Sequence, residues 1–418
     1  MLLKLFHNTK LLPVLGLICL MCFSFSPAKA QYFDIDNGYK SVRIPFKLVR
    51  NLVVIKLKIN GKGPFNFILD TGVGLMVITE PKLVDSINLQ NKRTIKMSGL
   101  GEGDAFEAYV TPPLKIEIPN LTSYDVAAAI LKTDHFNLSN FVGIPVHGLL
   151  GYEFFNNLAV KLSFVDSTIT VYRPRDVRKF RKGEKLPMTV EYHKPYIQAK
   201  VMLPNGTEQT SKLVIDLGAG HPISLENMIK KNGLPQKFVI ANLGVGLSGP
   251  ITGFLSRIDE VDIGKYRLKK VITSFPNDYD EATMKSLSVA RDGNLGVGIL
   301  KRFTVVFDYQ DNALYLKPNA YFGDPFEHDM SGIEYYAAGE GLKHLIISRV
   351  EPGSAADEVG LEKDDEITST CSRRRLMSDR KRICFPGAAA VLSVPPDDGQ
   401  SLTLEDLRPA LGLVGILA

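Results

Sequence analysis

The body of the chain lacks cysteine. Of the four cysteines among the 418 residues, two lie within the first thirty residues, and the others are Cys371 and Cys384 near the C-terminus. None occurs between Gln31 and Thr370. This absence excludes a disulfide scaffold and a cysteine nucleophile from that part of the chain.

Several other chemistries are missing. There is no G-x-S-x-G motif, so a serine hydrolase has little support. The formal net charge of +5 is small for this length, and no basic surface is interleaved with aromatic residues, so no nucleic-acid partner is expected. Six of the seven histidines lie beyond residue 30, and no two of them have metal-ligand spacing, so no metal site is expected. No organic cofactor is expected either. These histidines are His135, His147, His193, His221, His328 and His344.

Long apolar runs are also scarce. The run over residues 11–25 follows two lysines and precedes an A-x-A cleavage site at residues 28–30. This pattern predicts a signal peptide over residues 1–30, cleaved near Ala30, and export to the periplasm or the extracellular medium. The run is short and interrupted by Pro13, and no later stretch is longer, so no stable transmembrane span is expected.

What the sequence does contain is an internal repeat. The segment FILDTGVG, which holds Asp70, returns as LVIDLGAG, which holds Asp216, and GLLG returns as GNLG further along. Each aspartate follows two apolar runs separated by an Asn-Gly turn, the pattern of a β-hairpin. The aspartates are 146 residues apart, and Gly151 and Gly296 are 145 apart. This constant offset predicts a duplicated unit rich in β-structure.

The paired aspartates suggest a specific chemistry. Two such turns related by a pseudo-twofold axis would set two carboxyls side by side, where they share one proton. One carboxyl then acts as a base toward water, and the other, protonated, polarises a scissile carbonyl. Singly, each aspartate would be interpreted as a turn residue at its own strand end. The pair in register favours the catalytic interpretation, with His221 as a surface or supporting residue.

These motifs resemble the retropepsin-like and pepsin-like bacterial aspartyl proteases, in the subset that carries both lobes in one chain. The resemblance implies a mainly β fold with two duplicated retropepsin-like (acid protease) β-barrel lobes. It implies an aspartic-type endopeptidase that acts on peptides or proteins, with Asp70 and Asp216 as catalytic residues. The residues that would support the active-site loops are Thr71, Gly72, Leu217, Gly218, Gly151 and Gly296. Flap-like loops in contact with substrate would include Gly99, Gly101, Gly244 and Gly246.

Leu217 departs from the family pattern. The resemblance places there a Thr or Ser whose hydroxyl braces one lobe against the other, and Val73 and Ala219 likewise replace hydroxyl residues. A missing hydrogen bond costs about 1 kcal/mol or more when its partner stays buried. The alternative function is therefore a non-catalytic, peptide-binding relative of these proteases.

The C-terminal part is similar to a different family. Residues 341–367 resemble the middle of a bacterial PDZ domain, which implies a small α+β module that binds an extended peptide at a sheet edge. Gly341 and Leu342 lie where its carboxylate-binding loop is expected, and the alternative is a small structural β-domain. After about residue 368 the pattern is lost, which indicates either a frameshift in the coding sequence or a divergent insertion.

The expected organisation has five parts. They are a signal peptide (1–30), a first lobe (31–174), a solvated, charged linker (175–190), a second lobe (191–320) and a PDZ-like module (331–418). Because both lobes lie in one chain, a monomer is expected.

Overall fold

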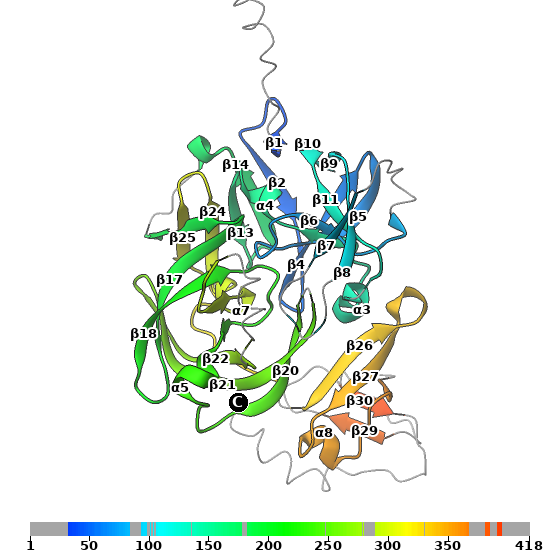
Figure 1. Ribbon diagram of the computed structural model, residues 1–418, viewed down its shortest axis with the longest axis vertical. Helices are drawn as coiled ribbons and strands as arrows, with labels where there is room; N and C mark the ends of the chain where they lie inside the picture. The colour runs from blue at the N-terminus through cyan, green and yellow to red at the C-terminus, as the bar shows by residue number, and fades with distance from the viewer. Residues whose placement is uncertain are drawn as a thin grey trace, which may run out of the picture.

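The computed structural model describes residues 32–83, 93–97, 101, 103, 106–134, 136–177, 182–246, 248–277, 279, 289–329, 331–367, 381–384 and 391–394. The predicted signal peptide, Gly99 and His135 lie outside these ranges. The region predicted to be a frameshift or a divergent insertion also lies outside them, apart from the backbone of β29 (Lys381–Cys384) and β30 (Val391–Val394). The described chain is mainly β, which confirms that prediction (Figure 1).

An eleven-stranded sheet surrounds the first aspartate. Its order is β1-β10-β9-β4-β5-β12-β6-β11-β8-β7, with β3 paired to β4. The predicted hairpin is confirmed, because β4 and β5 pair around the turn at Asn60 and Gly61. The strands are β1 (Asp34–Ile35), β3 (Lys47–Val49), β4 (Leu52–Ile59), β5 (Lys62–Leu69), β6 (Met76–Ile78), β7 (Arg93–Met97), β8 (Phe106–Val110), β9 (Leu114–Ile118), β10 (Leu121–Val126), β11 (Ala128–Leu131) and β12 (Gly148–Leu150).

An eight-stranded sheet surrounds the second aspartate, in the order β16-β17-β18-β23-β19-β22-β21-β20. In it β23 runs parallel to β18 and antiparallel to β19, just as β12 runs parallel to β5 and antiparallel to β6. The local pairing around Asp216 therefore repeats that around Asp70. The strands are β16 (Thr189–Glu191), β17 (Lys194–Met202), β18 (Glu208–Ile215), β19 (Ile223–Leu225), β20 (Val239–Gly246), β21 (Gly249–Ile263), β22 (Tyr266–Pro276) and β23 (Gly293–Leu295).

A six-stranded sheet joins the two halves, in the order β15-β25-β24-β13-β14-β2. Its central pair is β13 and β24, which come from different copies of the repeat. The strand β15 belongs to the expected linker 175–190, so that segment is in part a sheet strand and not solvated coil throughout. The strands are β2 (Ser41–Pro45), β13 (Ala159–Ser163), β14 (Thr168–Tyr172), β15 (Glu184–Pro187), β24 (Phe303–Asp308) and β25 (Ala313–Pro318).

Short helices connect the strands, and one apolar core runs through both halves. The helices are α3 (Leu138–Val142), α4 (Tyr152–Phe155), η1 (Pro174–Asp176), α5 (Met228–Asn232) and α7 (Val297–Leu300). The main cluster of buried side chains draws on both copies of the repeat. Across it Phe155 and Phe307 meet edge to face, with their ring centroids 5.3 Å apart. Because burial of apolar surface drives folding, this shared core makes the two halves one folding unit.

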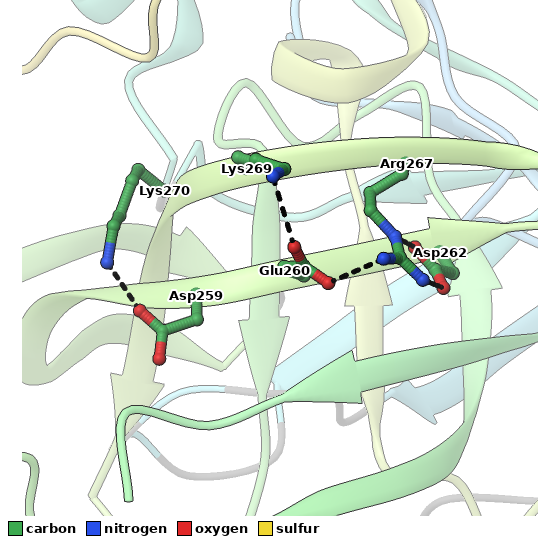
Figure 2. Close-up of polar contacts among 6 residues, drawn as sticks. All are labelled: Asp259, Glu260, Asp262, Arg267, Lys269 and Lys270. Atoms are coloured by element: carbon green, nitrogen blue, oxygen red, sulfur yellow. Dashed lines mark hydrogen bonds and ion pairs between the residues drawn. The ribbon is translucent and has the colours of Figure 1, made fainter. Parts of the chain in front are cut away.

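The long hairpin of β21 and β22 carries a row of exposed ion pairs across its strands (Figure 2). The pairs are Asp259–Lys270, Glu260–Arg267, Glu260–Lys269 and Asp262–Arg267, at 2.5, 3.2, 3.5 and 2.8 Å. Opposite charges facing each other across strands contribute roughly 0.2–1 kcal/mol per pair, less when exposed to salt. They are consistent with the register of this hairpin.

A small module follows, built of β26 (Ile333–Ala338), η2 (Glu340–Leu342), β27 (His344–Val350), α8 (Ala355–Glu358) and β28 (Glu366–Ile367). It has its own apolar cluster. Gly341 and Leu342 lie in the connection between β26 and β27, both with positive φ. No helix in the described ranges is long and apolar enough to cross a membrane.

The module rests on the body through β26, which packs against α3 (Figure 1). The Arg50 guanidinium lies 4.7 Å from the ring centroid of Phe141 and 4.4 Å from that of Tyr335. On the other side, Asn242 Nδ2 donates to Glu334 Oε2 at 3.1 Å. The module thus contacts α3 and Arg50 in the first half, and Asn242 of β20 in the second half.

Candidate active site

The two aspartates occupy equivalent places at the ends of β5 and β18. The Asp70 amide donates to Leu150 O at 2.9 Å, and the Asp216 amide donates to Leu295 O at 3.0 Å. Each carboxylate accepts a hydrogen bond from the amide of the glycine two residues later. Gly72 N lies 2.7 Å from Asp70 Oδ1, and Gly218 N lies 2.8 Å from Asp216 Oδ1. The D-x-G sequence therefore forms the same turn twice.

The two turns face each other so closely that both glycines are required. A Cβ on Gly72 would lie 2.9 Å from the carboxyl atoms of Asp216, and a Cβ on Gly218 would overlap the carboxyl of Asp70. In both cases the atoms that the added Cβ would meet are those of the opposite carboxyl, so a side chain at either glycine would displace that carboxyl. The structure thus brings Asp70 and Asp216 together, with Gly72 and Gly218 between the loops.

The pair holds a proton tightly. Asp70 is 8% exposed, and this burial raises its pKa well above the usual range. The charge of Asp216 and a hydrogen bond between the two carboxyls raise the pKa further, while the amide of Gly72 lowers it. Two carboxyls that cannot both ionise easily are the arrangement that retains one shared proton as the pH rises.

The hydroxyl of Thr71 ties the two loops together, and Leu217 offers no second hydroxyl. Thr71 is fully buried. Its Oγ1 donates to Ile215 O at 2.7 Å and accepts from Leu217 N at 3.0 Å. The Leu217 side chain is itself fully buried in the main apolar cluster. One half of a reciprocal clasp is therefore present, and packing occupies the place of the other.

The glycines after β12 and β23 lie directly under the two loops. Tyr152, which follows Gly151, donates its amide to Val73 O at 3.2 Å, and the amide of Val297 donates to Ala219 O at 2.8 Å. A Cβ on Gly151 would lie 2.7 Å from Asp70 O, and one on Gly296 would lie 2.6 Å from Ala219 O. Both glycines thus lie in close contact with the backbone of the aspartate loops.

Two hairpin turns, neither of which the sequence predicts to be part of the site, reach across from one half to the other. Asn51, before β4, donates from Nδ2 to Gly220 O at 2.9 Å. His193, before β17, lies against Gly74, where a Cβ would be 3.1 Å from the His193 Cβ. Both Asn51 and His193 have positive φ, 60° and 68°. Each aspartate loop is therefore held by a turn of the opposite half.

Asn294 contacts the second carboxyl directly, which the sequence does not predict. It precedes Leu295 and Gly296 in β23, and its Nδ2 donates to Asp216 Oδ2 at 2.6 Å. Leu149 holds the equivalent position in β12, so the difference between GLLG and GNLG was the available signal. His221 lies nearby. Burial lowers the pKa of its imidazole, while the charge of Asp216 raises it, so a supporting place fits His221 better than a surface one.

The glycine-rich hairpins meet one another. A Cβ on Gly101 would lie 2.5 Å from Gly249 O at the start of β21. Gly244 and Gly246 both lie in β20, where Gly246 pairs with Gly249. Gly99 lies outside the described residues. The two loops predicted to be flap-like are thus in contact through their tips.

Other candidate sites lie apart from the aspartates. One surface cavity is lined by Lys301 and Arg302, and another by Met228, Phe238 and Phe275, and neither is lined by the aspartates. Within the described ranges, no group of three or more His, Cys, Asp or Glu side chains could hold a metal ion.

Glu153, in the first turn of α4, is a buried acid behind the first loop. Its side chain is 7% exposed and accepts a hydrogen bond from Met76 N at 3.3 Å. Burial raises the pKa of Glu153 from 4.5 to about 7. A raised carboxyl pKa means that the folded state binds the proton more tightly. Its contribution to stability is therefore complete below pH 4.5 and is lost as the pH rises to about 7.

Glu153→Gln is expected to remove this loss. Relative to the wild type, the free energy of unfolding of the variant should rise by about 3 kcal/mol between pH 4.5 and pH 7. The measurement is urea unfolding of both proteins across that range. The difference between the two proteins in how the free energy of unfolding depends on pH removes the contributions of all other titrating groups. Parallel slopes would show that Glu153 titrates normally.

Residues 55–154 match the family model described as aspartyl protease. The matched segment begins within β4, contains Asp70 and Gly151, and ends within α4. A comparison with curated proteins finds no match. The mainly β architecture agrees with this family, and the match indicates peptidase chemistry of the aspartyl type.

Proposed function

We propose that this protein is an aspartic endopeptidase in which Asp70 and Asp216 activate a water molecule against a peptide bond. The observation that carries the proposal is the pair of equivalent turns. Each ends a strand, each holds its carboxylate with a glycine amide, and the two glycines allow the carboxyls to meet. The family match covers the first of these turns.

The surroundings of the two carboxyls support different roles for them. Both oxygens of Asp216 accept N–H donors, from Gly218 and Asn294. Asp70 is more deeply buried, and burial raises its pKa. Asp216 is therefore the base, and Asp70 carries the shared proton.

The reaction then needs no covalent intermediate. Asp216 takes a proton from water as the water oxygen bonds to the carbonyl carbon, and Asp70 gives its proton to the carbonyl oxygen. The resulting tetrahedral diol collapses when the carbon–nitrogen bond breaks. The proton on Asp216 goes to the leaving nitrogen, and a diol proton returns to Asp70. Atoms and charge balance, and the pair is restored.

The duplicated layout belongs to the same proposal. Each copy of the repeat supplies one aspartate, its own supporting glycine and a turn that reaches the other copy. A single chain then forms the complete site as a monomer. The one-sided clasp of Thr71 favours a second candidate, a peptide-binding relative without catalysis, because the opposite hydroxyl is absent at Leu217.

The small module and the N-terminus complete the proposal. The module is proposed to bind an extended peptide in the manner of a PDZ domain, since β26 is one of the two edge strands of its described sheet. The turn containing Arg50 and Asn51 links β26 to the second aspartate loop. Export after cleavage near Ala30 remains part of the proposal.

The test is digestion of a diverse peptide mixture in ¹⁸O-labelled water, from acidic to neutral pH, with products identified by mass spectrometry. We expect cleavage at internal bonds, with one labelled oxygen in each new carboxyl group. A folded protein that retains peptides without cutting them would support the non-catalytic candidate instead.

A further inference from the structure

A lysine lies beside the two aspartates. Burial and the charge of Arg291 lower the pKa of Lys194, whereas the charges of Asp216 and Asp70 raise it. Lys194 in turn lowers the pKa of Asp70. In the part of the chain that the structure describes, its ammonium makes no hydrogen bond and no ion pair within 4 Å. A partly buried positive charge is thus placed at the site without a partner of its own.

The internal repeat shows what this position would otherwise hold. Ile68, two residues before Asp70, pairs with Val54 in β4. Val214, two residues before Asp216, pairs with Tyr196 in β17. Two residues earlier in each strand stand Leu52 and Lys194. Leu52 is 6% exposed and packs in an apolar cluster. The lysine therefore replaces a buried leucine of the other half.

The same exchange extends over the whole face of the sheet. In the first half the face is apolar, with Leu52, Val54, Val77, Val146 and Leu149 in one cluster. By the strand registers, the equivalent residues of the second half are Lys194, Tyr196, Ser224, Arg291 and Asn294. Because Asn294 donates to Asp216 Oδ2, this face reaches the reacting carboxyls.

The charges on this face leave Lys194 unbalanced. Arg291 Nε and Nη2 donate to the two carboxylate oxygens of Glu226 at 3.0 and 2.7 Å. Both side chains are almost fully buried, at 6% and 2% exposure. A closed bidentate pair of this kind neutralises itself. Glu191, which lies opposite Lys194 across β16 and β17, is also paired, with Lys212 Nζ at 2.8 Å. The remaining positive charge belongs to Lys194, beside the carboxyls of Asp70 and Asp216.

We propose that Lys194 binds a carboxylate of the substrate, so that the second half of the site takes an acidic group and the first half an apolar side chain. The carboxylate belongs either to an Asp or Glu side chain next to the scissile bond or to the C-terminus of the peptide. This inference rests on the proposed function, because it specifies the substrate of the same site. A lysine ammonium loses favourable hydration when it is buried, and the electrostatic attraction of a nearby anion offsets that loss.

The test uses peptides that differ in one charge. From the best-cleaved sequence, matched peptides carry Glu or Gln beside the scissile bond, and end in a free carboxylate or an amide. Lys194→Met is expected to lower kcat/KM for the preferred carboxylate peptide about 10- to 100-fold, mainly through KM. For the matched neutral peptide, the same variant should change kcat/KM less than about threefold. Whichever pair loses discrimination identifies the source of the carboxylate.

Two further variants separate recognition from other effects. Lys194→Arg should retain the preference. Lys200→Met on the same strand removes an exposed lysine paired with Glu208. It should leave kcat/KM unchanged for both the charged and the neutral peptide. Equal losses on charged and neutral peptides with Lys194→Met would overturn the proposal, because they would indicate an effect through the aspartates. So would a wild type that does not distinguish the peptides.

Failure of catalysis would be distinguishable from failure of this inference. If the wild type cleaves nothing, fluorescence anisotropy measures the affinity of labelled hexapeptide mixtures with Glu or Gln at one fixed position, and with or without a free C-terminus. Tighter binding of a carboxylate mixture that disappears in Lys194→Met would support the subsite and contradict the proposed hydrolysis. Equal affinities would overturn the subsite.

Discussion

Asp70→Asn and Asp216→Asn are each expected to lower kcat/KM for peptide hydrolysis by about 10³-fold or more, since each removes one partner of the proton transfer. An amide at position 216 cannot accept the proton of water, and an amide at position 70 cannot release a proton to the carbonyl oxygen. The wild type should show a bell-shaped pH profile set by two apparent pKa values of the pair. The measurement is steady-state cleavage of a labelled peptide.

Stability measurements provide the control for this experiment. Because the pKa of Asp70 is raised, its contribution to folding is complete below the ordinary carboxyl range, near pH 4. It is lost as the pH rises through the folded-state pKa. Asp70→Asn should therefore unfold at neutral pH no more easily than the wild type. Asp259→Asn, in an exposed ion pair, should retain full activity. Undiminished cleavage by either aspartate variant at the site would refute the mechanism.

Thr71→Val is expected to lower the free energy of unfolding by about 2–5 kcal/mol, and activity with it. Valine has nearly the shape of threonine, so the core keeps its packing. The change removes both hydrogen bonds of the hydroxyl and leaves Ile215 O and Leu217 N–H without a partner. Leu217 has no hydroxyl that could compensate. Chemical denaturation measures the loss.

Thr71→Ser is the matched control, because it keeps the hydroxyl and deletes one methyl group. It should retain most of the stability and most of the activity. If Thr71→Val were as stable as Thr71→Ser, the methyl packing and not the hydroxyl would hold the loops. The one-sided clasp would then contribute little to joining the halves.

The local elements and their repetition could be read from the sequence. Alternation of apolar residues around Asn60–Gly61 and Asn205–Gly206 predicted both hairpins, because strand period and turn chemistry are properties of neighbouring residues. The structure places Asp70, Asp216, Gly151 and Gly296 in equivalent positions, as the constant offset of the repeat suggested.

The joining of the halves could not be read in the same way. The six-stranded sheet pairs β13 with β24, and its strand β15 comes from a segment whose charges predicted a linker. Strand partners distant in sequence are chosen by packing of whole faces. The local pattern of either strand is the same whichever partner it finds.

Local pattern and spacing by themselves determined the repeat, its hairpins and the two aspartates. Only the tertiary structure decided what surrounds those aspartates. Asn294 contacts Asp216, Thr71 alone carries the clasp, and Lys194 replaces a leucine beside the pair. The reason is physical. Hydrogen bonds and charge effects act between residues that only the completed fold brings together. The distance between such residues in the fold cannot be inferred from their separation in the sequence.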